Sequence, residues 1–138
     1  MAEIRTKFLF RFSFEVGPHY VVGTTPFGSR RVAPISGGRF EGPEVSGIVL
    51  PGAADWMTVD PAGAWFHINV QVPLRTQDGE FLTMAYQGFR SGPPEILERV
   101  SRGEPVDASS YYYRVTGSFE TASPKLARLN TEIGRAHV

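Results

Sequence analysis

The chain has 138 residues, in which 14 lysines and arginines balance 14 aspartates and glutamates, and it contains no cysteine. This length suffices for one domain with its own core, and the missing thiols exclude disulfides, thiolate metal sites and cysteine nucleophiles. Zero net charge provides no field to attract nucleic acids or anionic membranes. No apolar run exceeds three residues, so neither a transmembrane helix nor a signal-peptide core is expected. The sequence therefore predicts a single soluble, cytoplasmic domain over residues 1–138.

Alternation of apolar and polar residues predicts the two clearest strands. Every second residue from Phe8 to Val16 is aromatic or aliphatic, and the same pattern runs from Ala64 to Arg75. A period of two places the apolar residues on one face of a strand, which is then buried. Shorter β-favouring runs between glycine and proline clusters predict further strands at 20–24, 35–42, 45–50 and 56–59.

Two turn motifs flank the strand at 64–75. Residues 60–63 read Asp-Pro-Ala-Gly and residues 77–79 read Gln-Asp-Gly. Proline fixes one backbone dihedral and glycine supplies a positive φ, as tight turns require. We therefore expect strands at 55–60, 64–75 and 80–87 to form two successive hairpins.

The remaining elements lie in the C-terminal third. Residues 93–103 begin with two prolines, place apolar residues on one face and end in glycine, which predicts a short helix near 93–102. A strand is expected at 111–116, continuing over 119–121 after a break at Gly117. The tail from Pro124 onward fits either a helical turn around Leu126 and Leu129 or a final strand. Many short strands without a βαβ repeat favour an all-β antiparallel sandwich or closed barrel.

Asp55 and Trp56 form the most informative pair of candidate site residues. They follow the Pro51-Gly52 turn, which could hold the carboxylate beside the indole in a partly desolvated niche. Desolvation raises the pKa of a carboxyl group, as a general acid or base needs. The alternative is an aspartate that caps nearby backbone amides beside a core tryptophan.

Three further groups are candidates for binding. Arg31 follows a turn and could clamp a carboxylate or enolate oxygen, or it could belong to an exposed basic pair with Arg30. Tyr112 and Arg114 share one strand face and could line a cavity, with Glu120 able to pair with the arginine; ordinary aromatic packing with a rim ion pair is the alternative. The odd-numbered face at 65–71 carries Trp65, His67, Asn69 and Gln71, which would face solvent in an open sheet or a polar lumen in a closed barrel.

Sequence signals for cofactors and metals are weak. The chain lacks the nucleotide-binding, nucleophile-elbow and zinc-protease motifs, and its three histidines have no spacing relative to one another that suggests a metal site. We therefore expect no cofactor and no metal.

Several motifs together resemble the domain-of-unknown-function 3237 family over nearly the whole chain. They are VGTTP at 22–26, GSRRVAPISGGRFEGP at 28–43 and VLPGAADW at 49–56, followed by GPPE at 92–95, RGEPVD at 102–107, YYYR at 111–114 and FET at 119–121. The resemblance implies a single antiparallel meander β-barrel, similar to calycin-like or allene-oxide-cyclase-like barrels. It implies no settled activity.

Three functions remain open at this point, and the first of them is the one we predict. The first is a barrel that binds an apolar or aromatic small molecule, with Arg31, Trp56, Tyr86 and Arg114 orienting its polar end. The second is a cofactor-independent isomerase, cyclase or lyase acting on a carbonyl or polyketide-like substrate, with Asp55 or Glu120 moving a proton. The third is a fully packed structural protein that forms oligomers. A small-molecule partner is expected, without nucleic acid or membrane, and a homodimer is one way to cover unpaired edge strands.

Overall fold

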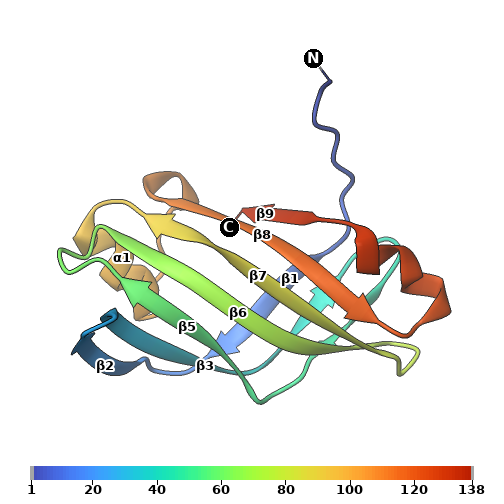
Figure 1. Cartoon of the computed structure of the whole chain (residues 1–138), viewed down its shortest axis with the longest axis horizontal. Helices are drawn as coiled ribbons and strands as arrows, with labels where there is room; N and C mark the ends of the chain where they lie inside the picture. Colours follow the sequence, from blue (N-terminus) through green and yellow to red (C-terminus); the bar gives the residue numbers. More distant parts are fainter. Residues whose placement is uncertain (1, 138) are drawn as a thin grey trace.

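A computed structural model describes residues 2–137, which form one antiparallel β-sheet of nine strands that curls into a barrel (Figure 1). The strands are β1 (Arg11–Val16), β2 (Tyr20–Thr25), β3 (Gly28–Glu41), β4 (Ser46–Val49), β5 (Ala53–Val59), β6 (Trp65–Thr76), β7 (Phe81–Ser91), β8 (Tyr112–Thr121) and β9 (Gly134–His137). The prediction of an all-β meander barrel is confirmed. No helix within residues 2–137 is long and apolar enough to cross a lipid bilayer.

The long strand β3 organises the first half of the barrel. Its first half pairs with β5 and its second half with β4, and both of these pair with β6 on their other edges. A closed ring of strand pairings therefore joins β3, β4, β6 and β5. On the opposite edge of β3, β1 and β2 lie end to end, while β6 to β9 continue as a simple meander.

Both hairpins around β6 form as predicted. Gly63 and Gly79 adopt positive φ values of 77° and 81° in their turns, and each donates its N–H to the carbonyl oxygen three residues earlier. Eleven residue pairs then join β6 and β7 without a register shift. The strand pair β6–β7 is the most continuous part of the sheet.

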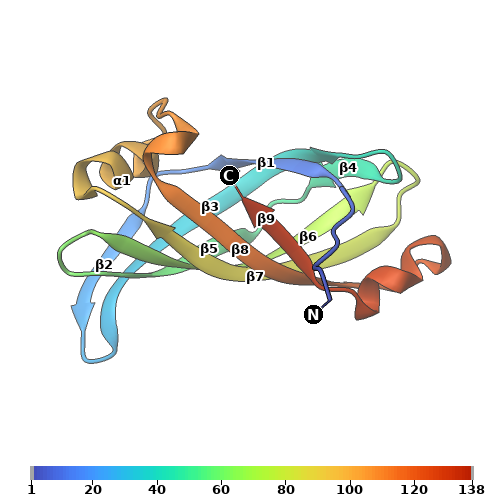
Figure 2. The same ribbon diagram turned by 90° about the horizontal axis from the view of Figure 1, so that it is seen from above.

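Aromatic side chains from β1 and the residue before it close the barrel interior. Figure 2 shows β1 across the barrel from β7 and β8. Phe10 meets Phe40 and Phe119 at ring distances of 5.0 and 5.8 Å, and Phe12 lies 5.9 Å from the ring of Tyr86. Together with the buried even-numbered residues of β6, these rings form one continuous core.

The helix α1 (Pro94–Ser101) covers one end of the barrel, beside β2 (Figure 1). Its position agrees with the predicted helix near 93–102. Leu97 is fully buried and anchors the helix. A 3₁₀ helix (Ala108–Ser110) precedes β8. The tail contains both predicted alternatives, a 3₁₀ helix (Pro124–Thr131) followed by β9.

Several boundaries differ from the prediction. β3 begins at Gly28 instead of residue 35, and β7 ends at Ser91 instead of residue 87. The first strand begins at Arg11 rather than near Phe8, because β3 provides partners only up to Glu41 and Phe8 remains exposed. β8 runs through Gly117 without a break. A Cβ atom at Gly117 would lie 2.9 Å from that of Tyr86, so this glycine makes room for the tyrosine instead of ending the strand.

Gly38 lies at the bend where β3 changes partner from β5 to β4. Its φ is 145°, and a Cβ atom there would lie 2.0 Å from the carbonyl oxygen of Ser13. We predict that Gly38→Ala lowers the free energy of unfolding by at least about 3 kcal/mol, because the backbone clash cannot be relieved by side-chain rotation. Gly103→Ala is the matched control, since its Cβ would meet nothing within 4 Å. It should cost only about 1 kcal/mol, the price of a positive φ. Urea denaturation measures the free energy of unfolding of both variants, and equal losses of stability in the two would contradict the prediction.

Candidate functional site

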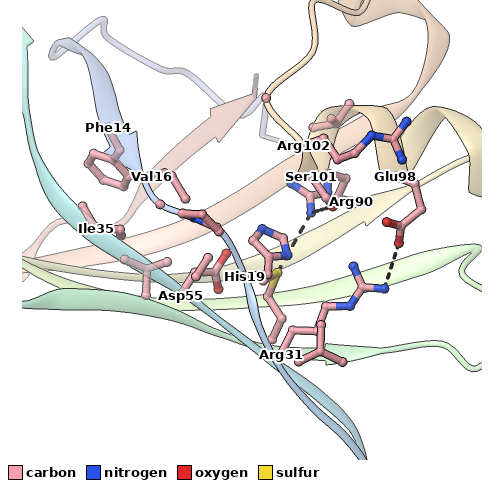
Figure 3. Close-up of a pocket in the computed structure, with 18 of the residues that line it drawn as sticks. Phe14, Val16, His19, Arg31, Ile35, Asp55, Arg90, Glu98, Ser101 and Arg102 are labelled. Carbon is pink, nitrogen blue, oxygen red and sulfur yellow. Dashed lines mark hydrogen bonds and ion pairs between the residues drawn. The ribbon is translucent and has the colours of Figure 1, made fainter.

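A cavity of about 750 Å³ lies at the end of the barrel beneath α1. Figure 3 shows its two chemically different ends. Phe14, Val16 and Ile35 form an apolar wall on one side, while Arg31, Arg90, Glu98 and Ser101 gather on the other, next to the helix. Asp55 and His19 lie between them. The cavity thus combines an apolar lining with a few converging polar groups, as small-molecule sites do.

Asp55 faces this cavity because β5 alternates and turns Asp55, Met57 and Val59 to the inside. Its Oδ1 accepts a hydrogen bond of 3.0 Å from the backbone N–H of Asn69 on β6. Within the described chain, the β5–β6 ladder has no paired residues between Asp55–Val70 and Thr58–His67, so the carboxylate occupies a local opening of the sheet. Burial raises the pKa of Asp55 from 3.8 to about 6, against the lowering effects of the Asn69 hydrogen bond and the positive charge of Arg90.

Arg90 is the most deeply buried cation in the cavity, with 7% of its surface exposed. Its Nη2 donates to Ser101 Oγ at 3.1 Å, and its guanidinium lies 4.7 Å from the ring centre of Phe66 and 5.7 Å from that of Tyr113. No carboxylate among residues 2–137 lies within ion-pair distance of it. Burial lowers its pKa, but an arginine keeps its proton at neutral pH. Arg90 is therefore a buried positive charge without an ion-pair partner.

Arg31, in contrast, is neutralised. Its Nη2 lies 2.8 Å from Glu98 Oε1, an ion pair that links β3 to α1. The guanidinium also lies 5.2 Å from the ring centre of Phe66, so both cavity arginines lie close to the same buried ring. The pair Arg31–Glu98 helps to position the helix over the cavity.

His19 enters the cavity from the short segment between β1 and β2. Its Nδ1 is buried and has no hydrogen-bond partner within the described chain. Burial lowers the pKa of His19 below 6.5, and the positive charges of Arg90 and Arg31 lower it further. The imidazole is therefore neutral at pH 7, and its Nδ1 is left without a partner within the described chain.

Two tyrosines complete the lining. Tyr86, 7% exposed, stacks on Phe14 at a ring distance of 6.3 Å, and Tyr113 lies against Arg90. Burial raises the pKa of both phenols, that of Tyr113 to about 12. Both hydroxyls are therefore protonated near neutral pH and available as hydrogen-bond donors.

The structure brings three of the predicted site residues together: Asp55, Arg31 and Tyr86 all line the cavity. The other predicted residues lie on the outer face of the sheet, away from it: Trp56, Asn69, Gln71, Tyr112, Arg114 and Glu120. The physical reason is strand alternation. Because Asp55 points inward, Trp56 must point outward, and it is 62% exposed.

The interpretation of a polar lumen along 65–71 is corrected in the same way. The even-numbered residues of β6 fill the interior, so Asn69 and Gln71 are left in solvent. Tyr112 and Arg114 do share a face, as expected, with the guanidinium 5.0 Å from the ring, but that face is the outer one. Glu120 also points outward on β8.

Sequence reasoning missed His19, Arg90 and Tyr113. A signal for Arg90 was present, because it continues the alternating row of Leu82, Met84 and Tyr86 and an arginine in an inward row is unusual. The inward orientation of Tyr113 follows from the alternation of β8 once the inward face of that strand is known. No pattern in the sequence marks His19, which lies outside every strand.

Ionisation of Asp55 should destabilise the fold. The folded pKa lies above the unfolded value, so the folded state binds the proton more tightly and stability falls as pH rises from about 4 to about 6. Asp55→Asn removes this loss and keeps an acceptor for the Asn69 N–H. We expect the variant to be about 1 to 3 kcal/mol more stable than the wild type at pH 7.5, with the difference vanishing below pH 4. Chemical denaturation across pH tests this, and a difference independent of pH would contradict it.

Several known proteins are similar to this chain in sequence or in structure. A UPF0311 protein of Bradyrhizobium diazoefficiens is 37% identical over 120 residues, which cover 87% of this chain and 78% of that protein. A crystal structure of a conserved protein of unknown function from Rhodopseudomonas palustris is 32% identical with a TM-score of 0.87, covering 98% of this chain and 87% of the other. The structure of an enzyme from Penicillium herquei shares the fold, with a TM-score of 0.64 at 18% identity, covering 99% of this chain and 88% of the other.

The family comparison agrees with these similarities and with the motifs at 22–56. The match to the family described as "Protein of unknown function (DUF3237)" extends over residues 4–136, which is almost the entire barrel. The chain therefore belongs to the DUF3237 family.

Proposed function

We propose that the protein is a cofactor-independent enzyme that moves a proton on a small carbonyl compound. One observation carries this proposal: Asp55, whose pKa is raised to about 6, shares a cavity with the unpaired cation Arg90. A carboxylate of raised pKa is a stronger base than a surface aspartate, yet it is still mostly ionised at pH 7. Such a pairing of a base with a fixed positive charge is typical of active sites.

The geometry supports a simple sequence of proton transfers. Asp55 removes a proton from the carbon next to a substrate carbonyl, and negative charge develops on the carbonyl oxygen as an enolate. The positive charge of Arg90 and the hydroxyl of Tyr113 stabilise that oxygen, because fixed charges and dipoles act strongly where water is excluded. Asp55 then returns the proton at the same or another carbon. Isomerases, cyclases and lyases share this first step, so they remain one reaction class here.

The size and lining of the cavity suggest the kind of substrate. A volume of about 750 Å³ lies in the range of small-molecule sites. The wall formed by Phe14, Ile35 and Val70 fits an apolar or aromatic body. The reacting carbonyl then lies toward Asp55 and Arg90.

The binding-only function is less well supported. It requires a cavity in which every carboxylate is paired, whereas Asp55 makes a single backbone hydrogen bond and no ion pair within the described residues. A purely structural protein requires a filled interior, which does not fit a cavity of this volume. In addition, one protein with this fold is described as an enzyme.

Hydrogen exchange of a generic ketone tests the proposal without knowledge of the natural substrate. 2-Tetralone in D₂O exchanges its acidic protons, and proton NMR follows the loss of signal. We expect the wild type to accelerate this exchange, with a rate that rises with pH through about 6 as Asp55 ionises. Asp55→Asn should reduce the acceleration about 100-fold or more, as expected when a general base is removed.

Asp78→Asn is the matched control, because Asp78 lies on an exposed turn and pairs with Lys125 at 2.9 Å. It should exchange the ketone at the wild-type rate. If wild type and Asp55→Asn accelerate exchange equally, the proposal is wrong. Ligand-induced thermal stabilisation without any exchange would support the binding function instead.

A further inference from the structure

The positive charges around the cavity are not all held in ion pairs. Arg31 is paired with Glu98, and Arg102 is paired with Glu104 at 2.7 Å. Arg90 remains without an ion-pair partner within residues 2–137, although it is the most buried of the three. A buried charge without a partner is costly, and the neighbouring aromatic rings offset only part of that cost.

Unpartnered polar atoms gather at the same place. Three buried side-chain atoms in the described chain have no hydrogen-bond partner: Arg90 Nε, His19 Nδ1 and Ser123 Oγ. The first two belong to residues that line this cavity. Arg90 comes from β7, and His19 comes from the segment between β1 and β2 (Figure 3). Native proteins leave few such atoms, so two in one cavity indicate that a bound molecule, a water or a ligand, satisfies them.

The remaining donors of Arg90 show what that ligand must supply. Its Nη2 is already engaged with Ser101 Oγ and lies 4.0 Å from the sulfur of Met57. The Nε–H is left free to donate, and an anionic oxygen is the acceptor that also neutralises the guanidinium. The opposite wall, with Phe14 and Ile35, is apolar.

We propose that the substrate enters this cavity as an organic anion. Its oxyanion lies on Arg90 Nε, next to the reacting carbonyl, and its apolar body lies against Phe14 and Ile35. A hydroxyl or other polar group of the same ligand meets His19 Nδ1. That this ligand is the substrate rests on the proposed function, whereas the preference of the cavity for an anion stands on Arg90 and can be measured separately.

An alternative role for Arg90 is purely structural, since its bond to Ser101 ties β7 to α1. The two roles predict different binding. A structural clamp gives the cavity no preference for charge, while an anion site distinguishes a carboxylate from an amide of the same shape.

The test compares 2-naphthoate with 2-naphthamide by isothermal titration calorimetry on the wild-type protein at pH 7.5. We expect the carboxylate to bind at least 10-fold more tightly than the amide. This comparison needs no variant and is therefore independent of any effect on folding. Equal affinity for the two compounds, or no binding of either, would overturn the proposal.

Variants then locate the anion. Arg90→Gln should remove the preference for naphthoate, and Arg90→Lys, which keeps the charge but loses Nε, should retain only part of it. Arg114→Gln is the matched control, because this arginine lies on the outer face over Tyr112. Glu98→Gln should tighten naphthoate binding several-fold by freeing the charge of Arg31. A preference for naphthoate that persists in a folded Arg90→Gln protein would overturn the assignment.

Asp55→Asn separates this proposal from the proposed function. It removes the base, so it cannot exchange ketone protons, but it also removes a negative charge from the cavity. It should bind naphthoate as tightly as the wild type or more so. Loss of exchange with retained anion preference supports both proposals, and anion binding in a wild type that exchanges no protons would refute only the enzyme. Weaker naphthoate binding by Asp55→Asn would argue against the anion site.

Discussion

The inward row of β6 is the constraint on which the rest of the molecule depends. Its even-numbered residues from Phe66 to Thr76 are all buried, and those from Phe66 to Leu74 lie opposite the inward row of β7 without a register shift. Strands with such a row must curl until the apolar side chains of β1 and β8 cover it. The barrel and its core therefore follow from one alternation pattern. The cavity lies near the end covered by α1, where polar residues occupy inward positions of the same pattern.

Polar groups are buried at the end of the barrel covered by α1, and this burial affects both the two arginines and Asp55. Phe66 lies beneath both Arg31 and Arg90, so the core itself positions the two cations. Only one of them receives a carboxylate, because Glu98 on α1 lies close enough to Arg31 alone. Asp55 is desolvated by the same walls, which raises its pKa. The proposed role of Asp55 as a base thus comes at a cost in stability, as is common at functional sites.

The fold was largely predictable from the sequence, and the site only in part. Several local signals correspond to elements of the structure. They are the period of two along 64–75, the turns at 60–63 and 77–79, and the proline-led helix near 93–102. Which face of a strand points inward depends on distant partners, so the sequence left the orientation of Asn69 and Arg114 open. The structure has both of them, and Trp56, on the outer face. Arg90 and His19 belong to the cavity only because β7 and the segment before β2 converge there, and that convergence is set by the register of β3.

The hydrogen bond from Asn69 to Asp55 uses the backbone rather than a side chain. The side chain of Asn69 itself points to solvent and contributes nothing to holding the carboxylate. Residue 69 can therefore change during evolution without disturbing the acid, provided that the new residue keeps an N–H and suits a strand. Proline alone among the common residues would remove the donor. The hydrogen bond that Asp55 receives is in this way insulated from substitution at residue 69, and this part of the surface can diversify while the surroundings of the carboxylate stay the same.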